Sequence, residues 1–217
     1  MTDPHRAITR GRKFDQVRRG AAAIFLRDGY AGASVDDIAR AGGVSKATLY
    51  TYFTDKSVMF HEVMRASAAE LLADSPRPAP VDLPPARHLA PLLRAMLDWL
   101  LSPDCLSLHR LAIAEAHRFP DCISDYVRQR DAAVLAPIRA QIDRWIAAGA
   151  IAPHDSARSA GNLAAMLAGA PVQQALLGSP PDPERIARLA GDCAWLFRLA
   201  HDRDLPAARG VHIPADA

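Results

Sequence analysis

The stretch SVDDIARAGGVSKATLYTYFTDK, residues 34–56, decides the fold of this chain. Short amphipathic helices are expected on either side of Gly42-Gly43, which makes a turn. Ser34 is expected to cap the first helix, with Asp37 completing a capping box, and Ser45 to cap the second. Small and hydroxyl side chains open the second helix and tyrosines close it. The pattern predicts a helix-turn-helix whose second helix has the chemistry to lie in a DNA major groove.

Helical spacing continues outward from this stretch. Apolar residues predict a helix over 13–28 that ends at Gly29, and a second one over 55–74 capped by Thr54. The proline-rich segment 75–91 predicts a linker, because proline interrupts helices. Residues 1–12 are expected to form a flexible basic arm, and residues 204–217 a frayed tail.

Further helices are predicted beyond the linker, with kinks at Pro137 and Pro171, over residues 88–101, 103–118, 121–148, 155–177 and 182–202. The expected fold is all-α with about nine helices. It comprises a three-helix helix-turn-helix domain over 13–60 and a helical domain over 61–203.

Composition supports this division and narrows the class of protein. Half of the residues are apolar and only 6% are aromatic, which favours helices over sheets. Residues 1–60 carry a net charge of +4 and the remainder carries −2, as expected for a DNA-binding head on a soluble body. The three cysteines lack a C-x-x-C spacing, so we expect reduced thiols. Neither an apolar leader nor a membrane-length apolar run is visible, which predicts a cytoplasmic protein without a membrane partner.

The helix-turn-helix offers several side chains to DNA. Ser45 lies at a helix N-terminus, where free N–H groups favour a phosphate, and Lys46 can donate to guanine. The predicted DNA-binding residues are Ser34, Ser45, Lys46, Thr48, Tyr50, Tyr52 and Lys56, with Arg10, Arg12 and Lys13 as further phosphate candidates. Alternatives remain open: the serines cap helices with or without DNA, Tyr52 can pack half-buried, and the others can be plain solvated surface.

Residues 20–60 resemble the N-terminal domain of the TetR family of bacterial transcriptional regulators. The resemblance rests on Gly29-Tyr30, Ser34, Ile38-Ala39, Gly43-Val44-Ser45, Leu49-Tyr50, Tyr52-Phe53 and Lys56. Ala47 stands where the family usually has glycine. The run LLSPDCLSLHRLAIAEAHRFPD, residues 100–121, resembles the AefR-like version of the family's C-terminal domain.

The resemblance implies a ligand-binding and dimerisation domain over 88–202. The last two predicted helices would form the dimer interface through Gly161, Ala165, Ala168, Leu189, Cys193, Leu196 and Phe197. Large apolar groups with a few polar tips would line an effector pocket: Met96, Trp99, His109, Ile113, His117, Phe119, Tyr126, Trp145, Met166 and Gln173. The alternatives are helices that pack only within one chain and side chains that fill a core. His109 and His117 have no third ligand at metal spacing, so no metal or cofactor is expected.

The function that follows is a DNA-binding transcriptional regulator. The most specific expectation is a homodimeric repressor that binds a near-palindromic operator and is released by a small lipophilic effector. A helix-turn-helix protein that no small molecule controls is the alternative. An enzyme is not expected, since the sequence shows neither a nucleophile–base pair nor a phosphate-binding glycine loop.

Overall fold

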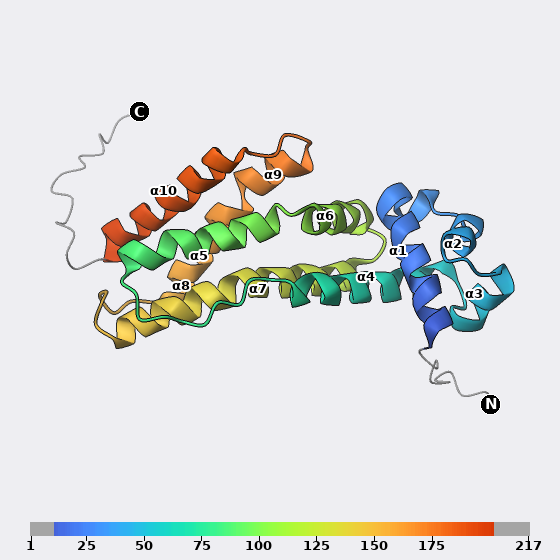
Figure 1. Ribbon diagram of the computed structural model, residues 1–217, viewed down its shortest axis with the longest axis horizontal. Helices are drawn as coiled ribbons and strands as arrows, with labels where there is room; N and C mark the ends of the chain where they lie inside the picture. Colours follow the sequence, from blue (N-terminus) through green and yellow to red (C-terminus); the bar gives the residue numbers. More distant parts are fainter. Residues whose placement is uncertain (1–10, 202–217) are drawn as a thin grey trace. The chain divides into compact units, whose positions relative to one another are not determined.

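The computed structural model describes residues 11–201, and these residues form helices and no strand (Figure 1). The helices are α1 (Arg12–Gly32), α2 (Val35–Ala41), α3 (Lys46–Tyr52), α4 (Lys56–Ala73), α5 (Pro85–Leu100), α6 (Pro103–Glu115), α7 (Pro120–Ala147), α8 (Ser156–Ala168), α9 (Ala170–Leu176) and α10 (Pro183–His201). The expected all-α class is confirmed. Residues 1–10 of the expected arm, Arg10 among them, and the expected tail lie outside the described residues.

Contacts divide the chain into two units. Among the described residues, the first contains 11–74 and 107–130, and the second contains 75–106 and 131–201. Both α6 and α7 therefore contribute to each unit. Because α4 groups with α1, α2 and α3, the first unit extends past the boundary expected at residue 60.

The first unit is organised by a close crossing of α1 and α2. A Cβ atom on Gly20 would lie 2.4 Å from the backbone nitrogen of Gly42, so the two backbones touch where both residues are glycine. Gly43 then takes a φ of 61°, which glycine adopts without strain, and the chain turns into α3. At the other end of α1, Gly29 breaks the helical conformation with a φ of 70°, as the sequence predicts.

An aromatic cluster joins the start of α7 to this unit. The ring of Phe119 stacks on Phe60 with centroids 4.4 Å apart and meets Tyr30 edge-on at 4.8 Å. Beside it, the largely buried carboxylate of Glu115 accepts the backbone N–H of Tyr30 at 3.0 Å. The end of α6 and the start of α7 are thereby fixed against the end of α1 and against α4.

In the second unit, α5 packs against α10 and α8, with Met96 and Leu97 fully buried. The segment 75–84 before α5 is pinned to α7. The buried amide of Gln141 bonds both the N–H and the carbonyl of Val81, and the indole of Trp145 donates to the carbonyl of Leu83 at 2.7 Å. This corrects the expected linker over 75–91: its first ten residues form a strap held by side chains.

Three predicted helix boundaries also need correction. α5 begins at Pro85, since proline fits the first turn of a helix, and it continues through Pro91. Asp55 caps α4 in place of Thr54, with its carboxylate accepting the N–H groups of Ser57 and Val58. The helix expected over 155–177 is two helices, because the chain breaks at Gly169 just before Pro171, while α7 runs through Pro137.

Between residues 11 and 201, none of the helices combines the length and the apolar character that crossing a bilayer requires.

Candidate DNA-binding site

The turn between α2 and α3 fixes how α3 presents its side chains. The hydroxyl of Ser45 accepts the N–H of Thr48 at 3.1 Å and lies 2.9 Å from the Thr48 hydroxyl, so Ser45 caps α3 as predicted. Leu49 and Phe53 are fully buried and hold α3 against the unit's core. The buried Leu49 orients the helix so that its early residues and Tyr50 face outward.

The predicted DNA-binding residues differ in exposure. Ser34, Ser45, Lys46 and Tyr50 are exposed, the Tyr50 side chain by about half, whereas Thr48, Tyr52 and Lys56 are half-buried. The ring of Tyr52 packs edge-on against Phe14 of α1 at 5.8 Å. α3 therefore offers an ammonium group, a phenol and hydroxyls along one exposed side.

Lys56, which is predicted to bind DNA, also makes contacts within the protein. Its ammonium group donates to the carbonyls of Tyr30 at 2.8 Å and Ala33 at 3.0 Å, and it lies 4.5 Å from the centre of the Tyr30 ring. These contacts tie the start of α4 to the segment before α2. An ammonium group has three N–H donors, so one remains for a phosphate.

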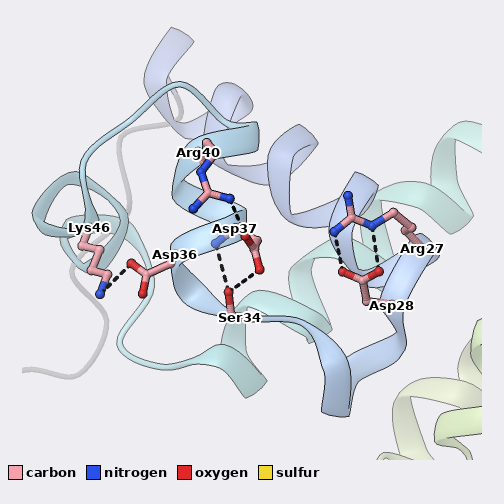
Figure 2. Close-up of polar contacts among 7 residues, drawn as sticks. All are labelled: Arg27, Asp28, Ser34, Asp36, Asp37, Arg40 and Lys46. Atoms are coloured by element: carbon pink, nitrogen blue, oxygen red, sulfur yellow. Dashed lines mark hydrogen bonds and ion pairs between the residues drawn. The ribbon is translucent and has the colours of Figure 1, made fainter.

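Aspartates pair with the cations around α2 and α3 (Figure 2). The Lys46 Nζ lies 2.6 Å from the carboxylate of Asp36, a hydrogen bond that raises the pKa of Lys46 above its ordinary value. Asp37 accepts the Ser34 hydroxyl at 2.6 Å and a guanidinium N–H of Arg40 at 2.6 Å. Those two bonds, with the Ser34 bond contributing more, hold the pKa of Asp37 below its usual value.

The expected capping box at α2 is therefore only half formed. Ser34 does accept the N–H of Asp37 at 3.0 Å. The Asp37 carboxylate accepts the Ser34 hydroxyl, however, and in a capping box it would accept the Ser34 backbone N–H.

The residues predicted to line an effector pocket do not form one group. His109, Ile113, His117, Phe119 and Tyr126 belong to the first unit, and Met96, Trp99, Trp145, Met166 and Gln173 to the second. Ile113, His117 and Gln173 face solvent. Because they face solvent, the assignment of these three residues to an interior pocket is corrected. Phe119 is part of the aromatic cluster and Trp145 holds the strap, and their assignment to a pocket stays a prediction.

A pocket does lie within the first unit, between α4 and the start of α7. Its cavity volume is about 310 Å³. Met64, Ala68 and Tyr126 form apolar walls, while His61, Asp121 and Gln129 supply polar groups. Of the ten predicted residues, Tyr126 lines this pocket.

The predicted dimer residues also divide into two sets. Cys193 and Phe197 are buried within the chain's own second unit, where Phe197 packs near Trp145 and His154, so their assignment to a partner surface is corrected. Ala165 and Leu196 are exposed, and Gly161, Ala168 and Leu189 are partly exposed. Trp195, which helical spacing alone does not mark as an interface residue, is 54% exposed beside Leu196.

Two charged residues of α2, Asp36 and Arg40, lie near α3 without a sequence pattern that marks them as DNA-binding residues. Asp36 precedes Lys46 by ten residues and lies on the other side of the turn. Helical spacing relates residues within one helix, so it does not predict this pair. Arg40 lies three residues after Asp37 on one helix, and that spacing alone favours their ion pair.

Comparison with known proteins agrees with this geometry. Residues 17–63 match the family described as "Bacterial regulatory proteins, tetR family", and residues 87–201 match the "AefR-like transcriptional repressor, C-terminal domain". A TetR-family regulator from Mesorhizobium loti has a similar structure, with a TM-score of 0.72 and 26% identity, covering 88% of this chain and 97% of its own. The flavonoid-responsive regulator FrrA reaches a TM-score of 0.68 at 26% identity, covering 90% and 100%.

A sequence relative is the helix-turn-helix transcriptional regulator YhgD of Bacillus subtilis, itself uncharacterised. It is 24% identical over 143 residues, which span 64% of this chain and 72% of YhgD. The exposed recognition helix and the two matched domains lead to one conclusion. The chain belongs to the TetR family of bacterial regulatory proteins: it is a DNA-binding transcriptional regulator and not an enzyme.

Proposed function

We propose that this protein is a cytoplasmic, homodimeric repressor that binds a near-palindromic operator and leaves it when a small lipophilic effector binds. The observation that carries the proposal is the orientation of α3, which buries Leu49 and exposes Lys46 and Tyr50. Lys46 and Thr48 would reach base edges, while Ser34, Ser45, Tyr50, Tyr52 and Lys56 would hold phosphates.

The dimer would form through the exposed apolar residues of α8 and α10. Met166, Trp195 and Leu196 are large apolar side chains with at least a third of their surface exposed. Such a cluster favours an interface, because burying it removes apolar area from water. A two-fold pair would place two α3 helices in successive major grooves about 34 Å apart, which a near-palindrome requires.

The effector site would be the pocket between α4 and α7. A volume of about 310 Å³ is at the lower end of the roughly 300–1,000 Å³ typical of ligand pockets. Its walls come from the helix that begins directly after α3, so a ligand that favours one placement of α4 would move α3. FrrA is named for its response to flavonoids, which makes flavonoids the first compounds to test.

The DNA side is tested with a duplex that the wild-type protein selects from a random library. The double variant Lys46→Ala/Tyr50→Ala should bind this duplex at least tenfold more weakly, because a good base contact contributes about 1–3 kcal/mol. Arg139→Ala, which removes one exposed cation from α7, is the matched control and should bind within twofold of wild type. A folded double variant with wild-type affinity at equal salt would contradict the proposal.

The effector side is tested by adding flavonoids and medium-chain fatty acids to the protein–operator complex. At least one compound should release the operator, and Cys122→Trp, which fills the pocket, should bind DNA normally but no longer respond. Release of the wild type and of Cys122→Trp at the same concentrations would place the effector elsewhere. If the protein binds the operator tightly and no compound releases it, the alternative holds: a DNA-binding protein that no small molecule controls.

A further inference from the structure

The helix-turn-helix of this protein carries no net charge. Residues 34–56 contain three cations, Arg40, Lys46 and Lys56, and three aspartates, Asp36, Asp37 and Asp55. Non-specific affinity for DNA comes almost entirely from cations that replace counterions on phosphates. A helix-turn-helix without net charge therefore adds little to the affinity of the protein for arbitrary DNA.

The cations of this segment are also engaged. Arg40 is bound by Asp37, and Lys56 donates to two backbone carbonyls. Lys46 is the one cation between residues 45 and 55, and its Nζ lies 2.6 Å from Asp36. Asp36 projects from the start of α2 across the turn toward α3, and Figure 2 shows its carboxylate directed at the Lys46 ammonium.

Both members of this pair are open to water. The side chains of Lys46 and Asp36 are 56% and 60% exposed, so the pair adds little to folding stability and breaks easily. A phosphate that approaches the Lys46 ammonium brings its negative charge next to the Asp36 carboxylate, and the repulsion between the two anions favours release of one of them. The Asp36 carboxylate and a DNA phosphate therefore compete for the Lys46 ammonium at the point where α3 would enter the groove.

We propose that Asp36 is a specificity-determining residue: it holds Lys46 when the protein meets arbitrary DNA and yields it only where α3 fits the operator. This inference rests on the proposed contact of α3 with DNA. On a random duplex, Lys46 could only exchange one carboxylate for one phosphate, and because that exchange gains little, Lys46 stays with Asp36. On the operator, Lys46 can donate to N7 and O6 of a guanine while the rest of α3 fits the groove, so leaving Asp36 gains a base contact that random DNA does not offer.

The test compares wild type with Asp36→Asn on a mixed-sequence duplex and on the selected operator duplex, across a salt series. Asp36→Asn should tighten binding to the mixed-sequence duplex roughly two- to fivefold, the range of an exposed ion pair. The salt dependence should steepen by about one phosphate contact, a slope change of roughly 0.9. Operator binding should tighten less, so the ratio of operator to mixed-sequence affinity should fall.

Two control variants distinguish the effect of the Asp36–Lys46 ion pair from the effect of a change in net charge. Asp98→Asn removes an aspartate from the exposed Arg94–Asp98 pair of α5 and makes the same change in net charge, so it should leave both affinities within about twofold. In a Lys46→Met background, Asp36→Asn should have no further effect, because Asp36 acts through Lys46.

Three results would overturn the inference. The first is equal tightening by Asp36→Asn with and without Lys46, which would make Asp36 a simple repeller of phosphates. The second is an unchanged affinity ratio, and the third is an Asp98→Asn variant that behaves like Asp36→Asn. If wild type selects no sequence from the library, the proposed function fails, whereas the effect of Asp36 on the mixed-sequence duplex is still measured.

Discussion

The two units of this protein differ in the character of the surface that they expose: polar on α3 and apolar on α10. In the first, short helices are held by a glycine-to-glycine crossing and by side-chain caps, and the exposed side of α3 is polar. In the second, α5, α8 and α10 bury a core around Met96 and Leu97, yet α10 exposes Trp195 and Leu196. The contrast teaches that polar recognition here depends on a tightly fixed backbone, whereas the apolar surface needs only a regular helix.

The largest expected effect separates the two faces of α10. Phe197→Ala should destabilise the second unit by about 3–5 kcal/mol, because it empties a buried site between Trp145 and His154. Trp195→Ala, on the exposed face, should change the stability of the monomer by less than about 0.5 kcal/mol and instead weaken dimerisation. Denaturant unfolding and sedimentation at several concentrations measure the two effects. Equal losses of stability in both variants would contradict the distinction between the faces.

The second prediction compares two helical glycines. Gly20→Ala should destabilise the first unit by about 3 kcal/mol, since its Cβ would meet the Gly42 backbone at 2.4 Å and neither backbone can move aside cheaply. Gly191→Ala places the same methyl group in open space on α10 and should stabilise the protein by roughly 0.5–1 kcal/mol. Thermal unfolding followed by circular dichroism checks both. A tolerated Gly20→Ala would mean that α1 and α2 cross less tightly than described.

The close crossing also shows what sequence pattern can and cannot predict. Capping serines, the Gly-Gly turn and helical periodicity are local signals, so α2, α3 and the buried Leu49 follow from the sequence. The role of Gly20 does not, because its partner Gly42 is 22 residues away and only the fold brings them together. The Asp36–Lys46 pair was missed for the same reason.

The second unit was harder to predict because apolar periodicity does not say which neighbour covers a side chain. On α10, Cys193 and Phe197 were assigned to a partner, but they face the chain's own core, one helical turn apart. Pro85 and Pro91 favour a linker by sequence alone, yet the first lies at the start of α5 and the second is accommodated within α5. Hydrogen bonds from the Gln141 and Trp145 side chains to the backbone of the strap have no signature in the sequence.

The third prediction concerns the hydrogen bond between Glu115 and Tyr30, whose loss should have an intermediate effect on stability. Glu115→Ala should cost about 1–3 kcal/mol, since it leaves the partly buried N–H of Tyr30 without its acceptor. Glu184→Ala removes an exposed partner of Arg188 on α10 and should cost less than about 0.5 kcal/mol. Urea unfolding compares them. A Glu115→Ala variant as stable as Glu184→Ala would show that α6 does not hold the Tyr30 segment.

The smallest expected effect is a difference in how the units respond to acid. In the second unit, burial lowers the pKa of His88, and burial followed by the neighbouring His154 lowers that of His201. The unfolded chain takes up these protons at a pH near the usual histidine pKa of about 6.5, before the folded chain does. The second unit should therefore lose some stability as the pH falls from 7 through 6, and the loss should level off below the folded-state pKa values.

The first unit should respond at a lower pH. Bonds to Ser34 and Arg40 lower the pKa of Asp37, and bonds to Ser57 and Val58 lower that of Asp55. Their contribution is complete above the unfolded aspartate pKa of about 3.9 and disappears only as the pH falls through the folded-state values. Hydrogen exchange at pH 7.0 and 5.5, corrected for intrinsic rates, should show weaker protection in α5 and α10 at the lower pH, with α2 and the start of α4 unchanged. The double variant His88→Gln/His201→Gln should abolish this difference. Protection that falls equally in α2 would show that the acid response does not arise from these two histidines, because neither lies in the first unit.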